Sequence, residues 1–364
     1  MEKEQHNGTI SIWKFIFCLV IAVFHGKLLF PNGNMPIFKG GYIAVEFFFI
    51  VSGIYFAKSA LKETKTKKPI GEETVSFIWN KLKKLLPYIV ISYIMSITFY
   101  QFFNSQLSIS QKVNSIWNVL LIKEFGFRGF IISSAWWYLT GMYASMFVLY
   151  PFIKKYKENF ILNVSPIIVL VLLGYLSARW GHLDQSFKVL DGHLSTGMLR
   201  AFAEINLGMI VYYINQKLKN IEYTKTFRIA LTLISEAFLI AVLIIISVIS
   251  RHSEYDYVML AMIATSILII NSGKTIEKKL FSNKFIFFLE KISMPIFINH
   301  QFFFIVIWRT EYFNRFTTTQ NVIMYLSSAV VFSIIEYLII SKVQKKEFPK
   351  IKKLFIVEKK KKTT

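Results

Sequence analysis

The sequence has almost no cysteine and comparatively few acidic residues. Cys18 is its only cysteine, so no disulfide can form within the chain, and cysteine gives no information about the redox compartment. Asp and Glu number 21 against 43 Lys and Arg, which gives a net charge of +22 at pH 7. Such a charge can indicate a nucleic-acid-binding protein, but here the lysines lie in short blocks between apolar segments. This distribution argues against nucleic acid as a partner.

The sequence also lacks a small-x-small cleavage site, an internal repeat and a second domain. Its first apolar run is full length, so we expect an uncleaved spanning helix rather than a signal peptide. With 54% hydrophobic and 17% aromatic residues and a mean hydropathy of +0.47, the composition is typical of a protein surrounded largely by lipid. Cys18, inside the first run, is expected to be a small buried hydrophobic residue.

Ten apolar segments approach the length of a membrane span, which is about 20 residues. The sixth contains Arg200 and Glu204, and the second and eighth are short. We therefore predict an all-α fold, a polytopic integral membrane bundle of about ten transmembrane helices, with a membrane domain over residues 1–341 and a basic tail over 342–364. The segments lie at 10–30, 41–58, 85–103, 135–153, 160–178, 196–214, 229–250, 257–272, 285–308 and 321–341.

The basic residues predict how this bundle is oriented. With the N-terminus in the cytoplasm, the segments on that side, together with Lys58, carry 30 of the 43 Lys and Arg residues, and the opposite side carries 10. Basic residues favour the cytoplasmic side, and one helix more or fewer would destroy this bias. We therefore expect both termini in the cytoplasm and a tail that lies along anionic lipid.

Two ionisable side chains, Lys14 and His25, lie within the first apolar segment. Ionisable groups inside spanning helices are costly, so each is a candidate functional residue. The two residues are eleven positions apart, which on an α-helix is within about 20° of a whole number of turns and about 16 Å along the axis. Both side chains should therefore face one groove at different depths. The alternatives are that Lys14 reaches the inner headgroups and that His25 caps a helix end.

The second apolar segment carries Glu46 near its outer end. In an antiparallel helix pair, Glu46 would lie at a depth similar to that of His25. A carboxylate beside an imidazole fixes its tautomer and raises its basicity. We therefore expect His25 to act as a general base and Glu46 to orient it. A purely structural hydrogen-bonded pair is the alternative.

Further polar residues lie inside the sixth and ninth segments. Arg200 and Glu204 are four residues apart on one helix, which favours an internal ion pair over a contact with substrate. In the ninth segment, Lys291, Ser293 and His300 are expected to face inward, and Pro295 can kink the helix and free a carbonyl group.

The loop at 181–193 contains two histidines and two aspartates. Their spacing matches no known metal site, so we expect a solvated loop and no bound metal. The four residues are His182, Asp184, Asp191 and His193.

In their order along the chain, these residues resemble the membrane acyltransferase-3 family, whose members O-acylate sugars of bacterial surface polysaccharides. Where that family has an Arg-x10-His pair in its first helix, this chain has Lys14 and His25. Its second helix has an acidic residue, a Phe-rich run and Ser-Gly-Phe. VEFFFIVSGIY is similar, with Glu46 and Ser52 in place and Ile54 for the last Phe.

Three further motifs follow in the family's order. KLKKLLPY resembles a basic Arg-x-x-Arg-(Leu/Ile)-x-Pro motif, with Lys81 and Lys84 in place of the two arginines. A Trp-Tyr-Leu run begins at Trp137. A Lys-x-Ser…His pattern near the end supplies Ser293 and His300. The chain looks closest to compact members without a soluble domain, including those that acetylate or succinylate exopolysaccharide.

This resemblance implies an enzyme of the bacterial cytoplasmic membrane that takes an acyl group, usually acetyl, from acyl-CoA. CoA is cytoplasmic and polyanionic, and Lys14, Lys81 and Lys84 are expected to bind its phosphates. His25 would deprotonate a hydroxyl of a sugar or polysaccharide acceptor as it attacks the acyl carbonyl. Direct transfer and a transient acyl-histidine both remain open.

The other inward-facing polar residues are expected to contact substrate or to form a polar core; they are Ser52, Arg200, Glu204, Ser293 and His300. The expected partners are the acceptor glycan, acyl-CoA and membrane lipid. A transporter or flippase for a polysaccharide precursor is the main alternative function, although transporters often show two related halves.

Overall fold

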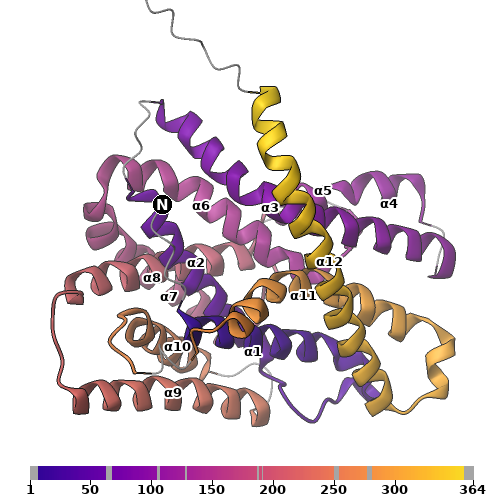
Figure 1. Cartoon of the computed structure of the whole chain (residues 1–364). Helices are drawn as coiled ribbons and strands as arrows, with labels where there is room; N and C mark the ends of the chain where they lie inside the picture. The colour runs from indigo at the N-terminus through magenta and orange to yellow at the C-terminus, as the bar shows by residue number, and fades with distance from the viewer. Residues whose placement is uncertain are drawn as a thin grey trace, which may run out of the picture.

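The computed structural model describes residues 7–62, 68–104, 107–127, 129–186, 188–190, 192–249, 254–276 and 281–355. Within these ranges the chain is almost entirely helical, and its only strands form one antiparallel hairpin (Figure 1). The α-helices are α1 (Gly8–His25), α2 (Ala44–Ala60), α3 (Ile70–Phe99), α4 (Ile109–Asn114), α5 (Ile116–Val119), α6 (Trp137–Tyr156), α7 (Ser165–Trp180), α8 (Thr196–Leu218), α9 (Lys225–Val248), α10 (Asp256–Asn271), α11 (Lys284–Arg309) and α12 (Thr318–Phe355).

The hairpin pairs β1 (Val189–Leu190) with β2 (Leu194–Ser195), directly before α8. Single turns of 3-10 or π helix join or extend the longer helices. They are η1 (Gly26–Leu29), η2 (Pro31–Gly33), η3 (Gly41–Ile43), η4 (Tyr100–Asn104), η5 (Lys123–Phe125), η6 (Ser134–Trp136), η7 (Phe160–Val164) and η8 (Glu311–Arg315).

Ten of the described helices lie at the ten positions where the sequence predicts membrane spans. Seven of these helical segments are long and apolar enough to cross a membrane, namely those that contain α1, α2, α3, α7, α9, α11 and α12. α10 is apolar but shorter, with 16 residues. α6 and α8 have 20 and 23 residues, and more than half of each helix is buried against its neighbours, which explains how they tolerate more polar side chains. The prediction of an all-α polytopic membrane bundle is therefore confirmed.

The contacts between helices have the directions that ten successive crossings require. Helices an even number of crossings apart should run parallel, and successive helices should run antiparallel. Parallel contacts join α1 to α11 (Lys14–Glu290 and His25–His300) and α2 to α8 (Glu46–Arg200 and Gly53–Gly208), and antiparallel contacts join α11 to α12 (Phe288–Tyr337 and Phe304–Tyr325).

α2 and α8 pack backbone against backbone. A Cβ atom added at Gly53 would lie 2.3 Å from the carbonyl oxygen of Ile205, and one added at Gly208 would lie 2.2 Å from that of Ile50. Small residues permit this approach in membrane bundles, where close van der Waals packing drives helix association. The close crossing brings buried polar side chains of the two helices within hydrogen-bond distance.

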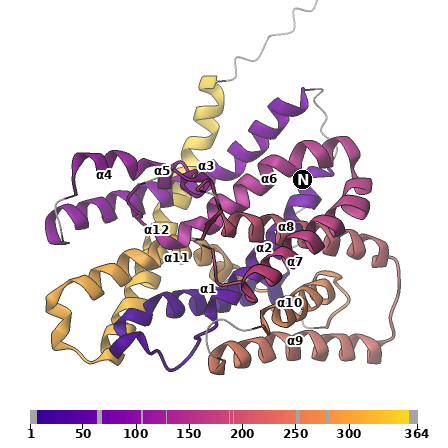
Figure 2. The ribbon, with the colours of Figure 1, turned by 180° about the vertical axis from the view of Figure 1, so that it is seen from behind.

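α12 continues to Phe355, beyond residue 342, where the basic tail is predicted to begin. Figure 1 shows its C-terminal end and the N-terminal part of α3 projecting from the same side of the bundle, and Figure 2 shows the same arrangement from behind. The two helices are joined by a hydrogen bond of 3.2 Å from the Gln344 amide to the carbonyl oxygen of Lys84. Residues 356–364 lie outside the described chain, and the lipid contact of the tail stays a prediction.

Candidate active site

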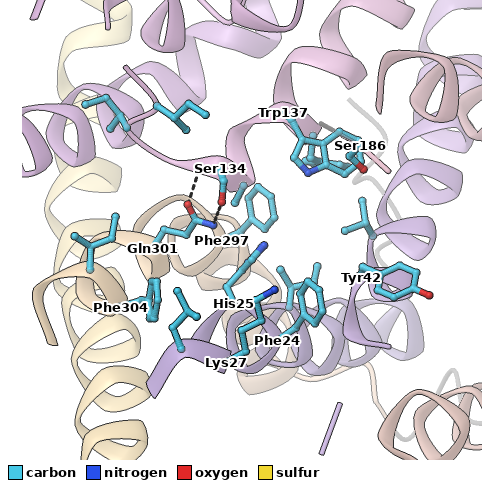
Figure 3. A pocket seen from close by; sticks show the side chains of 18 of the residues that line it. Phe24, His25, Lys27, Tyr42, Ser134, Trp137, Ser186, Phe297, Gln301 and Phe304 are labelled. Atoms are coloured by element: carbon cyan, nitrogen blue, oxygen red, sulfur yellow. Dashed lines mark hydrogen bonds between the residues drawn. The ribbon is translucent and has the colours of Figure 1, made fainter. Parts of the chain in front are cut away.

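A cavity of about 330 Å³ lies among α1, α2, α6, α8 and α11. This volume is within the usual range for a small-molecule site. Its walls are mostly aromatic and aliphatic, and its polar side chains include His25, Ser134, Ser186 and Gln301. Figure 3 shows His25 directed into this cavity from α1, with Gln301 of α11 nearby and Trp137 of α6 on another wall.

Gln301 fixes one wall of the cavity. Its side-chain oxygen accepts a hydrogen bond of 2.5 Å from the backbone N–H of Ser134 and one of 3.2 Å from the Ser133 hydroxyl, and its amide donates to the Ser134 hydroxyl at 2.5 Å (Figure 3). These bonds tie α11 to the start of η6. Gln301 directly follows His300, so the same helix turn carries a wall contact and the imidazole pair.

His25 and His300 form a hydrogen-bonded, stacked pair. His25 Nδ1 lies 2.8 Å from His300 Nε2, and the ring centroids are 5.0 Å apart. His300 is fully buried, and its Nδ1 lies 2.8 Å from the carbonyl oxygen of Phe297. A carbonyl oxygen can only accept, so His300 Nδ1 carries the hydrogen and, in a neutral ring, Nε2 is the acceptor.

That tautomer of His300 determines the tautomer of His25. Since His300 Nε2 accepts, His25 Nδ1 must donate, and the lone pair of a neutral His25 ring is then on Nε2. A neutral imidazole with its lone pair on one nitrogen and its N–H held by an acceptor has the arrangement of a general base. His300 is therefore placed to orient His25.

Glu46 is paired with Arg200. The guanidinium atoms Nη2 and Nε of Arg200 both contact the Glu46 carboxylate, with Nε at 3.2 Å. The Nε atom also lies 3.3 Å from a carboxylate oxygen of Glu204. All three side chains are almost completely buried. The predicted ion pair between Arg200 and Glu204 is therefore present. Glu46 also pairs with Arg200, because α2 packs against α8.

The predicted antiparallel packing of α1 and α2 is also present. The ring of Phe24 contacts that of Tyr42, with centroids 5.9 Å apart, and Phe17 contacts Phe47. His25 is thus level with Tyr42, and Glu46 lies about one turn further along α2. The arrangement gives Glu46 the partner Arg200 and gives His25 the partner His300. Orientation of His25 by Glu46 stays a prediction.

Arg200 also holds the loop before the hairpin. Nη1 donates to the carbonyl oxygen of Leu183 at 3.1 Å and to the Ser186 hydroxyl at 3.3 Å, and Nη2 donates to the carbonyl oxygen of Tyr42 at 3.0 Å. The guanidinium lies over the Trp137 ring, 5.4 Å from its centroid. Since Arg200, Ser186 and Trp137 all line the cavity, one buried cation organises three of its walls.

Asp256 anchors the same loop from α10. Its carboxylate accepts hydrogen bonds from the Tyr42 hydroxyl, at 2.9 and 3.0 Å, and from the backbone N–H of Leu183 at 2.8 Å. The loop at 181–193, predicted to be solvated, is thus fastened to the bundle at Leu183 and Ser186. Among the described residues no group of three or more His, Cys, Asp or Glu side chains is placed to hold a metal, and Asp191 lies outside the described chain.

Lys14 and His25 both contact α11, which is consistent with side chains on one face of α1. The Lys14 ammonium is part of an ion pair. Lys14 Nζ lies 2.5 Å from Oε1 of Glu290 on α11, and the Ser11 hydroxyl donates to the other oxygen at 2.6 Å. The ammonium also lies 5.0 Å from the centroid of the Tyr55 ring. Sequence reasoning missed Glu290 because the pairing of the first and ninth spans is not visible in the order of the chain.

Lys81 and Lys84 lie on α3, before Pro87. Lys81 Nζ is 5.0 Å from the centroid of the Phe77 ring, and Lys84 is exposed near the contact with α12. Both lie in the N-terminal half of α3. A contact of Lys14, Lys81 or Lys84 with phosphate stays a prediction.

Ser52 and Ser293 lie deeper in the bundle than His25, whereas Lys291, predicted to face inward with Ser293, is exposed. The Ser52 hydroxyl is 3.2 Å from the Tyr138 hydroxyl, and the Ser293 hydroxyl donates to the carbonyl oxygen of Leu289 at 2.8 Å. Ser293 and Tyr138 line a small cavity of about 10 Å³ that shares Ile21, Val45, Tyr138 and Phe297 with the larger one. A narrow gap therefore continues from the level of His25 toward that of Ser293.

Comparison with known proteins gives one match. The model of a family described as an acyltransferase domain matches residues 7–340, nearly the whole chain. Searches of curated proteins and of solved structures found no match. The ordered motifs, the helical bundle and this match agree with one another. The chain therefore belongs to the membrane acyltransferase-3 family and is a multi-pass membrane acyltransferase.

Proposed function

We propose that this enzyme transfers an acyl group, acetyl in the first instance, from cytoplasmic acyl-CoA to a hydroxyl of a cell-surface sugar or polysaccharide in the bacterial cytoplasmic membrane. The observation that carries the proposal is the His25–His300 pair: one imidazole lines a 330 Å³ cavity, and the other, 2.8 Å away, holds its N–H. The cavity supplies room for a hydroxyl and an acyl group beside a nitrogen that can accept a proton.

The proposed reaction uses His25 as general base. The acceptor hydroxyl attacks the thioester carbonyl while its proton moves to His25 Nε2, a C–O bond forms, and the C–S bond then breaks. The departing CoA thiolate takes the proton back from His25. General base catalysis typically contributes about 10² to 10⁴ in rate. An acyl-histidine intermediate, in which Nε2 itself attacks the carbonyl, uses the same geometry.

The donor is proposed to enter from the side on which α3 and α12 project. Lys81 and Lys84 would bind CoA phosphates there as point charges. Since Glu290 already lies 2.5 Å from Lys14, a phosphate at Lys14 would share that ammonium with the carboxylate. The acyl-pantetheine arm would pass the narrow gap beside Ser293, which must widen to admit it. Both termini are proposed to be cytoplasmic, because the basic residues follow the positive-inside rule in that orientation.

His25→Ala is the direct test of this function. We expect purified wild-type protein to hydrolyse radiolabelled acetyl-CoA slowly or to be labelled by it, and the variant to lose this activity by at least about 10²-fold. Detergent-solubilised variant should elute in size-exclusion chromatography as the wild type does. A wild-type protein inert toward acetyl-CoA would instead favour the transporter or flippase alternative.

A further inference from the structure

A second cavity of about 710 Å³ adjoins the one that contains His25. The two cavities share Tyr100 and Ile131, so they are adjacent at the end of α11 that follows His300. Trp308 lines the first cavity, and its neighbour Arg309 lines the second. The remaining walls of the second cavity come from η4, from α4 and from the segment before η6. They are formed by Tyr100, Gln111, Asn114, Gly129, Phe130 and Ile131.

The second cavity combines a cation with side-chain amides and aromatic rings. Arg309 is the one charged side chain among its described lining residues, and it is exposed at the last residue of α11. Its guanidinium lies over the Trp308 ring, 4.2 Å from the centroid, which holds the planar group at the join between the cavities. Gln111 and Asn114 of α4 add side-chain amides to its lining. A cation with amides around it suits an anionic, hydrogen-bonding ligand.

Aromatic side chains make up the apolar part of the same cavity. Tyr100 and Phe130 pack edge to face with their centroids 4.8 Å apart. Aromatic rings offer a rigid surface with little loss of conformational entropy, and polar groups at their margin fix the orientation of a ligand. A sugar ring, which has an apolar face and hydroxyl groups at its edge, has this combination of surfaces.

We propose that the second cavity is an acceptor subsite that binds an acidic sugar unit next to the one acylated at His25, with its carboxylate on Arg309. This inference rests on the proposed function, since it takes the His25 cavity as the place where the acceptor hydroxyl reacts. Because the cavities are adjacent, one glycan chain that passes Tyr100 and Ile131 could reach both. The subsite would favour an acidic oligosaccharide over a neutral one of equal length.

Binding measured without catalysis tests the subsite. Purified full-length protein in phosphatidylcholine nanodiscs would be titrated by calorimetry with a hyaluronan tetrasaccharide, which carries glucuronate, and with neutral chitotetraose. We expect the acidic oligosaccharide to bind more tightly, and Arg309→Ala to weaken its binding about tenfold while leaving chitotetraose unchanged. Arg309→Lys should lie between, since it keeps the charge but loses the planar fork. Arg315→Ala is the control, because Arg315 is exposed on η8 but does not line the cavity.

Several outcomes would overturn the subsite. These are equal binding of the two oligosaccharides, no binding of either, and acidic binding that Arg309→Ala leaves unchanged. Arg309-dependent binding of short-chain phosphatidylglycerol, without Arg309-dependent binding of the acidic oligosaccharide, would show that a lipid phosphate occupies Arg309 instead. A different result would reject the proposed function while leaving the subsite in place. If wild type is inert toward acetyl-CoA but shows Arg309-dependent acidic binding, the anion site stands and the transferase does not.

Discussion

His300 presents its Nε2 atom to His25 Nδ1, and the carbonyl oxygen of Phe297 holds its other nitrogen at 2.8 Å. The orientation of His25 thus depends on a chain of two hydrogen bonds that ends on the backbone of α11. A side chain held in this way has its ring orientation and tautomer set in the resting enzyme, without a rearrangement before each turnover.

Replacing His300 tests this dependence. His300→Phe keeps an aromatic ring but removes the acceptor, so we expect the kcat for acyl transfer to fall about 10- to 100-fold with little change in KM for acyl-CoA. His300→Gln, whose side-chain oxygen can accept the same N–H, should retain more activity than Phe. Steady-state kinetics and the pH profile of kcat are the measurements. Equal activity in wild type, Gln and Phe variants would show that His300 does not position His25.

The sequence identifies candidate functional residues more reliably than it identifies which of them contact one another. His25 and His300 stand out because ionisable side chains are rare in apolar spans. Their contact could not be predicted, since they are far apart in the chain and the order of spans does not give the neighbours of a helix. The sequence predicts only that Glu46 and His25 lie at a similar depth. In the fold, the packing of α2 on α8 places Arg200 at hydrogen-bond distance from Glu46.

At the scale of elements, the crossing of α2 and α8 sets the position of the buried cation. Gly53 and Gly208 let the two backbones touch, and Glu46 and Arg200 meet two turns away on the same two helices. Sequence reasoning found both helices but not their contact. Glycines within a span indicate close packing without identifying the partner.

Gly53→Ala should disrupt this crossing. Its Cβ would lie 2.3 Å from the Ile205 carbonyl oxygen, so the helices must separate, at a cost of about 1–3 kcal/mol as for other overpacked sites. We expect a lower melting temperature in detergent and a loss of acetyl-CoA turnover. Gly71→Ala on α3 is the matched control, because no atom lies within 4 Å of its added Cβ. Equal melting temperatures for both variants would contradict the account.

The segment between α3 and α6 contains a buried carboxyl group in η5. Burial raises the pKa of Glu124 above its ordinary value, although Lys123 Nζ lies 3.9 Å away and opposes the shift. A carboxyl group with a raised folded-state pKa stabilises the fold at acid pH, and this contribution is lost as pH rises through that pKa.

Glu124→Gln should therefore change the pH dependence of stability. The variant should melt at a higher temperature than wild type near pH 7, and the difference should shrink as pH falls toward about 4, the ordinary range for Glu. Thermal unfolding of both proteins across this range in one detergent is the measurement. Glu311→Gln, at an exposed site in η8, is the control. A pH-independent difference between wild type and the Glu124→Gln variant would contradict the burial argument.

At the scale of the whole molecule, the ten apolar segments of the sequence correspond to ten helices of the described chain. The contacts among α1, α2, α8, α11 and α12 run in the directions that alternating crossings require. Local composition is enough for this level of prediction, because lipid requires each span to satisfy its own backbone hydrogen bonds. The cavities were not predictable, since their walls combine side chains from α1, α6, α8 and α11 with loops between them. The arrangement places His25 at one end of α1 and Lys14 nearer the other, beside the same helix.

The central claim is that the bundle brings an acyl group from CoA on its lysine-rich side to His25. Wild-type protein and His25→Ala would be reconstituted in sealed vesicles, sorted by accessibility of the C-terminal tail to protease, with labelled acetyl-CoA supplied on one side only. We predict release of labelled acetate by wild type when acetyl-CoA is on the side of the tail, and none above background by the variant. Equal release by His25→Ala, or release by wild type regardless of side, would contradict the account.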